Sequence, residues 1–75
     1  MNLYLLTNLT PLDWDTYRNM VVIAPNEQEA IKIRPYATCG KEAFPLEKEF
    51  IEVLFLGIAS PDLKQGVIVS EYNAG

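Results

Sequence analysis

The chain has no residues with which to cross-link itself. It holds one cysteine, Cys39, and no histidine, so neither an internal disulfide nor a zinc site of the usual four-ligand kind can form. A chain of 75 residues buries only about 60% of its unfolded surface, so without such cross-links its stability should be modest. Because 49% of the residues are apolar and 21% are charged, we expect a single folded domain over residues 1–75 rather than disorder.

The charge and the first residues exclude two classes of partner. Ten acidic residues against six basic ones give a net charge of −4, which opposes binding to phosphate backbones, so we expect no nucleic-acid partner. Residues 1–6 have neither the basic segment nor the long apolar run of a signal peptide or membrane span. With the lone cysteine, this predicts a cytoplasmic protein that does not engage a membrane.

Apolar segments bounded by turn-forming residues predict four strands. The first is apolar on both alternating faces, the second is rich in β-branched residues and stops at Pro25, and the fourth follows Gly66. The third is the longest, and Glu52 stands among its apolar residues, where it could limit open-ended pairing with other chains. The expected strands cover residues 2–7, 20–24, 50–59 and 67–70.

One helix is expected between the second and third strands. Asn26 is placed as its N-cap, with Glu29 three residues later as a variant of the capping box. Ala30 and Ile33 share one face, and Pro35 makes continuation difficult, so the helix should have two to three turns.

Two of the predicted connections between strands and helix are long. Residues 8–19 read as a loop, and residues 36–49 as an irregular connection, long for a domain of this size. The predicted fold class is α+β: a two-layer β-β-α-β-β domain with one short helix on a mainly antiparallel four-stranded sheet.

The chain also resembles a group of small proteins of phage genomes and bacterial chromosomes that have the same length and layout. The resemblance lies in elements spread over most of the chain: residues 3–7, the triplet 15–17, the strand 21–24, Pro35 and the final run 66–75. It implies a fold and a phage-like setting, and no particular chemistry. Two positions depart from the pattern: Arg18 stands where an acidic residue is expected, and Arg34 where histidine is expected.

Candidate catalytic and metal sites are weak throughout. Cys39 has no histidine to activate it, and its nearest cation in sequence is Lys41. Asp13 and Asp15 form a close acidic pair, but two residues of spacing in a loop supply no cleft, and no EF-hand pattern is present. We therefore predict that the protein is not an enzyme, with no cofactor and no metal.

Aromatic residues supply the candidate binding site. Trp14 stands between two acids, and tyrosine and tryptophan are enriched at interface hot spots, although a tryptophan in a small domain more often closes the core. A chain end normally frays, and the resemblance at the last residues adds the alternative of a tail that docks into the fold or lines a site. The predicted binding residues are Trp14, Asp15, Tyr17, Arg18, Tyr72 and Asn73.

Two functions remain open at this point. The first is a non-enzymatic protein-binding module, such as a phage accessory factor that inhibits or modulates a host protein. The alternative is an oligomer that sequesters a nucleotide or another small molecule, with aromatics stacked on a base and Arg18 or Arg34 on a phosphate.

One short helix cannot shield both faces of such a sheet, so we also expect a homodimer that uses the uncovered face or edge. The expected face carries Leu54 with Leu56, and Val67 with Val69. In a monomer, the connection 36–49, with Phe44 and Leu46, would have to cover that face instead.

Overall fold

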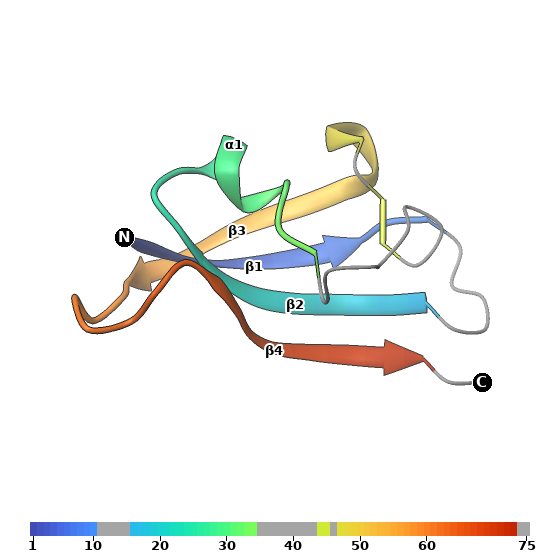
Figure 1. Ribbon diagram of the computed structural model, residues 1–75. Helices are drawn as coiled ribbons and strands as arrows, with labels where there is room; N and C mark the ends of the chain where they lie inside the picture. Colours follow the sequence, from blue (N-terminus) through green and yellow to red (C-terminus); the bar gives the residue numbers. More distant parts are fainter. Residues whose placement is uncertain (11–15, 35–43, 46, 74–75) are drawn as a thin grey trace.

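The structure is a computed structural model that describes residues 1–10, 16–34, 44–45 and 47–73, with the backbone alone at 16 and 71–73. It contains a four-stranded antiparallel sheet and one short α-helix, which confirms the α+β class (Figure 1). The elements in chain order are β1 (Asn2–Asn8), β2 (Thr16–Ala24), α1 (Glu27–Ala30), the 3₁₀ turn η1 (Lys48–Phe50), β3 (Ile51–Ile58) and β4 (Gly66–Asn73).

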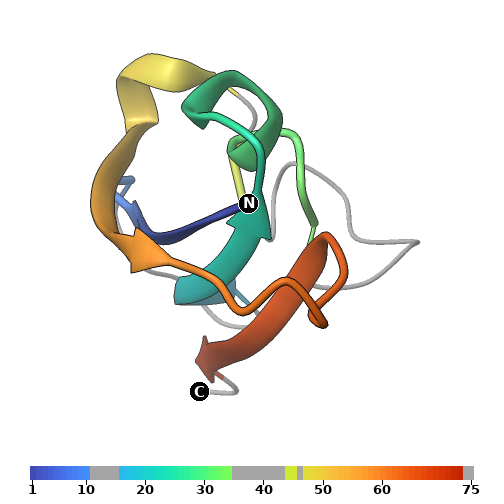
Figure 2. The same cartoon turned by 90° about the vertical axis from the view of Figure 1, so that its left-hand side faces the viewer.

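The strands are ordered β3-β1-β2-β4, so the first two strands form the centre of the sheet and the last two its edges. Each neighbouring pair is antiparallel. The sheet curves around the elements above its concave side, where α1 and η1 lie (Figure 2). The 59–65 connection runs from one edge to the other past the start of β1 (Figures 1 and 2).

Two strands are longer than the sequence predicts. β2 begins at Thr16, so residues 16–19 belong to a strand rather than to the predicted loop. β4 continues to Asn73 and pairs with β2 over its whole length, so the backbone of the tail does not fray at Tyr72 and Asn73. Each extension supplies the hydrogen-bonding partner of the other, which a segment read alone does not reveal.

The helix begins where predicted and ends earlier. Asn26 is its N-cap, and its side-chain oxygen accepts a hydrogen bond from the backbone N–H of Glu29 at 2.9 Å. After Ala30 the bonds tighten to three-residue spacing, from Lys32 N–H to Glu29 O at 3.2 Å and from Ile33 N–H to Ala30 O at 3.1 Å. β-branched residues and the nearby Pro35 disfavour further α-helical turns, and the helix is four residues long instead of two to three turns.

The core lies between the concave side of the sheet and α1. Phe44 is fully buried in it, although it comes from the connection between α1 and η1. The guanidinium Nη1 of Arg34 donates to the carbonyl oxygens of Phe44 at 2.6 Å and Pro45 at 3.2 Å, which holds this segment in place. The buried cluster consists of Tyr4, Leu6, Met20, Val22, Ala24, Ala30, Phe44 and Ile51.

Candidate functional site

The opposite side of the sheet, which we call the open face, carries a row of four aliphatic residues. The registers place Leu5 opposite Val21 on one side and opposite Leu54 on the other, and Val21 is in turn opposite Val69. Residues opposite one another in a sheet point to the same face. The row Leu54–Leu5–Val21–Val69 therefore crosses all four strands.

Both ends of this row are accessible to solvent. Leu54 is 54% exposed and Val69 is 58% exposed, while Leu5 and Val21 between them are partly buried. α1 lies above the other face (Figure 2). In the part of the chain that the structure describes, the row is thus a band of apolar surface without a covering helix.

The rows on either side of the band differ in character. On one side, Glu52, Thr7 and Asn19 form a polar row across three strands. On the other side, Leu3 is paired with Gly57 and Ile23 with Gly66, so the two edge positions of that row have no side chain. Ile23 is only 2% exposed, so the middle of that row is already buried. The band therefore has a polar border on one side and a largely buried apolar border on the other.

A bulge in β4 corrects the predicted composition of the open face. The register shifts between Val21 and Val22, so that Val69 is opposite Val21 whereas Val67 is opposite Val22. Val22 is buried on the covered face, and Val67 packs against the core there. Val67 and Val69 consequently point to opposite faces, because Ile68 is an extra residue between them.

A second bulge affects the predicted pair in β3. Leu54 lies on the open face as expected, but the register shifts beyond Phe55, and Leu56 has no residue of β1 opposite it. Gly57 follows with a φ of +151°, a conformation that favours glycine. Leu5 and Val21, in the central strands, complete the band, and the sequence prediction did not assign them to it.

The sequence offered the connection 36–49, with Phe44 and Leu46, as a cover for the open face of a monomer. For Phe44 this prediction is wrong. That side chain belongs to the core cluster on the covered face. Leu46 lies outside the described residues. Of the two apolar residues expected to cover the open face in a monomer, Phe44 thus lies on the other side of the sheet.

The predicted binding residues fall into three groups. Trp14 and Asp15 lie outside the described residues. Tyr17 and Arg18 lie in β2 rather than in a loop; Tyr17 packs partly buried against the core, and Arg18 is an exposed bulge residue. Tyr72 is opposite Tyr17 in the register, so the structure brings these two positions together, with Asn73 next to them opposite Thr16.

Asn8 organises the same end of the sheet and was not predicted as a functional or structural residue. It is buried, donates from its side chain to the carbonyl oxygen of Tyr17 at 3.0 Å, and accepts from the backbone N–H of Thr10 at 2.9 Å. A buried amide needs such partners. Asn8 therefore holds the end of β1 against β2 next to the Tyr17 position.

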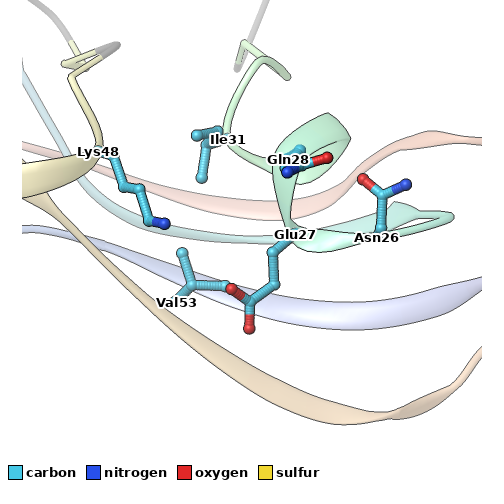
Figure 3. Close-up of a pocket in the computed structure, with 6 residues that line it drawn as sticks. All are labelled: Asn26, Glu27, Gln28, Ile31, Lys48 and Val53. Carbon is cyan, nitrogen blue, oxygen red and sulfur yellow. The ribbon is translucent and has the colours of Figure 1, made fainter.

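A small open pocket lies between α1 and β3 (Figure 3). Its volume is about 270 Å³, slightly below the roughly 300 to 1,000 Å³ of sites for drug-sized ligands. Glu27 and Lys48 both reach over its apolar floor (Figure 3). The lining residues are Asn26, Glu27, Gln28, Ile31, Lys48 and Val53.

Arg18 and Arg34, which the sequence suggested as phosphate ligands, do not line this pocket. Arg34 uses Nη1 for the two carbonyl oxygens of residues 44 and 45, and its buried Nη2 has no partner within the described residues. Arg18 lies on β2, a different element from the pocket lining. The structure therefore does not bring an arginine to the pocket.

Metal-binding groups and membrane-spanning helices are both absent from the described residues. No group of three or more cysteine, histidine or carboxylate residues in them could hold a metal ion. Among the helices that the structure describes, none is long and apolar enough to cross a membrane.

Comparison with known proteins gives no further assignment. No family model, curated protein or solved structure matches the chain. The open face, the pocket and the paired ends of β2 and β4 are therefore the observations on which a function has to be argued.

Proposed function

We propose that the protein is a non-enzymatic binding module of two-layer β-β-α-β-β architecture that contacts a partner protein through its open face. The observation that carries this proposal is the Leu54–Leu5–Val21–Val69 row, which crosses the whole sheet and is half exposed at both ends. Exposed apolar patches with polar borders are typical of protein interaction sites.

The size of the chain fits such a role. Its accessible surface is 4824 Å², and a standard interface buries about 800 Å² on each partner, roughly a sixth of that surface. The open face of the sheet would supply this area. Burial of apolar area there contributes about 25 cal/mol per Å² before the cost of association is subtracted.

Charge and setting narrow the kind of partner. The net charge of −4 disfavours nucleic acid and favours a protein surface with compensating basic residues around an apolar centre. With the resemblance to phage and bacterial proteins, this supports a cytoplasmic accessory factor that inhibits or modulates a host protein.

Affinity capture with matched variants tests the proposal. Val69→Lys places a charge at the end of the row, whereas Ile58→Lys places the same charge at a 79% exposed aliphatic residue paired with Asn2, toward the other face. Both changes are at exposed edge-strand positions, so we expect both variants to fold. Proteins captured from a bacterial lysate by the wild type and by Ile58→Lys, but lost with Val69→Lys, would support the proposal.

The contrary result is equally specific. If Val69→Lys retains every captured protein, or if Ile58→Lys loses the same proteins, the open face is not the binding surface. Circular dichroism and thermal melting of both variants show whether a loss of capture reflects a loss of folding.

The pocket supports a second candidate function, the binding of a small molecule. Its opposite charges, Glu27 and Lys48, fit a small zwitterion better than a nucleotide, since Glu27 would repel a phosphate. A thermal-shift screen over amino acids and nucleotides tests it, because a ligand that binds only the folded state raises Tm. No shift with any compound at millimolar concentration would exclude these ligands.

A further inference from the structure

The two edge strands differ in how well they could pair with another strand. Each edge strand carries one bulge, at Leu56 in β3 and at Ile68 in β4, and bulges are a usual protection of sheet edges. The pairing of β4 with β2 shifts a second time, at Arg18. β3 pairs with β1 without interruption from Ile51 to Phe55, and no described strand lies beyond it (Figure 2). β3 is therefore the more regular edge of the sheet, with a regular segment from Ile51 to Phe55.

The outward backbone groups of β3 follow from its pairing. Leu9 N–H donates to Phe50 O at 2.9 Å, and hydrogen-bonded and non-hydrogen-bonded pairs alternate along an antiparallel ladder. The pair Leu5–Leu54 is then hydrogen-bonded, like Leu9–Phe50. It follows that the backbone N–H and C=O groups of Ile51, Val53 and Phe55 point away from β1.

The side chains of β3 lack most of the usual protections of an edge. Such strands are commonly short or carry lysine or proline, whereas β3 has eight residues and Glu52 as its one charged residue. Leu54, Phe55 and Leu56 are each about half exposed in succession. Both its backbone and its side chains are thus available to a further strand.

We propose that a second copy of this chain pairs antiparallel with β3, edge to edge, about a two-fold axis at Val53. This register pairs Val53 with Val53 of the second copy and Ile51 with Phe55 of the second copy. All outward groups of the regular segment are then used, for about six backbone hydrogen bonds. The inference goes beyond the proposed function, since it requires no foreign partner.

Neighbouring registers are less favourable. An axis at Glu52 places this carboxylate opposite itself, and like charges directly opposite destabilise a sheet. An axis at Leu54 leaves Ile51 opposite the region of the bulge and yields about four bonds instead of six. With the axis at Val53, Glu52 of each copy is opposite Leu54 of the other.

In this register, a negative and a positive charge at position 54 should have opposite effects on the dimer. Leu54→Glu places two carboxylates opposite each other twice per dimer, and we expect the dimer to weaken at least about tenfold. Leu54→Lys places an ammonium opposite Glu52 of the second copy, and we expect dimerisation within about threefold of wild type, weakening as salt is added. Both substitutions change the same exposed residue, so a general folding defect would affect both variants alike. It would not produce a difference in dimerisation between them.

Light scattering after size exclusion, over about 1 to 300 μM, measures the outcome. Wild type and Leu54→Lys should approach twice the chain mass of 8.5 kDa, and Leu54→Glu should remain near the single mass. Val69→Glu, on the other edge, should behave as wild type.

Three results would overturn the proposal. Wild type could remain a monomer throughout the range. Both Leu54 variants could dissociate, which indicates a different register or face-to-face contact. Val69→Glu could dissociate, which indicates that the open face or β4 forms the contact instead.

Discussion

The covered and open faces of the sheet are built from the same four strands and differ in what the rest of the chain places on them. On the covered face, α1 and Phe44 pack against side chains from β1, β2 and β3. On the open face, the aliphatic row ends in two residues that are about half exposed. Strand alternation thus determines which residues share a face, but the connections determine which face is closed.

One short helix can close the covered face because another segment shares that role. α1 contributes Ala30 to the core, and much of the remaining covering comes from Phe44, which no helix carries. Phe44, which the sequence offered as a cover for the open face, is buried on the covered one. Among the described residues, Leu54 and Val69 at the ends of the aliphatic row have no such covering.

The largest expected effect is the truncation of a buried phenylalanine. Phe44→Ala removes a side chain with 0% exposure and should reduce the free energy of unfolding by about 3 to 5 kcal/mol, because a cavity remains in the core. For a domain of this size, that change leaves little folded protein. Urea denaturation followed by circular dichroism measures it.

Phe55→Ala is the matched control. Phe55 is 53% exposed and stacks edge-on against Tyr4 with ring centroids 5.8 Å apart, so its loss should be near 1 kcal/mol. Equal losses at the two positions would contradict the assignment of Phe44 to the core.

Asn8 and Thr7 are neighbours in β1 whose side chains lie on opposite faces of the sheet, so substitutions at the two positions compare the faces directly. Asn8→Ala removes the donor to Tyr17 O and the acceptor for Thr10 N–H, and should cost about 1 to 3 kcal/mol because buried partners lose their bonds. Thr7→Ala, on the open face, should cost less than half as much. A larger loss from Thr7→Ala in the same urea measurement would mean that the open face contributes more to folding than the structure indicates.

The smallest expected effect is a change of polarity without a change of shape. Val69→Thr should alter stability by about 0.5 kcal/mol or less, since the hydroxyl remains in water. Val22→Thr makes the same change on the covered face, where Val22 is fully buried, and should cost about 1 to 3 kcal/mol. Thermal melting of both variants tests whether the two faces differ in solvation.

The sequence predicted the parts of the fold that depend on local pattern. All four strands and the helix start at Asn26 follow from apolar runs, turn residues and capping chemistry. The strand at residues 16–19 was missed, because its polar sequence becomes a strand only by pairing with the end of β4.

The composition of the candidate surface was harder to predict. The bulge at Ile68 moves Val67 to the covered face, and no residue of that run marks an insertion. Gly57 inside a strand pattern is a recognisable signal of a bulge, and it could have identified the irregularity beside Leu56. The burial of Phe44 depends on contacts far apart in sequence, which periodicity does not contain.

The most direct test of the account is the accessibility of one residue on each face. Val69→Cys and Val22→Cys are each made in a Cys39→Ser chain, and their reaction with a maleimide is followed at about 1 μM. We predict that the thiol at position 69 reacts within about tenfold of its rate in urea, and that the thiol at 22 reacts at least about a hundredfold more slowly than in urea, through transient opening. Similar protection of both thiols would contradict the account, since it would mean that the chain covers both faces of its own sheet.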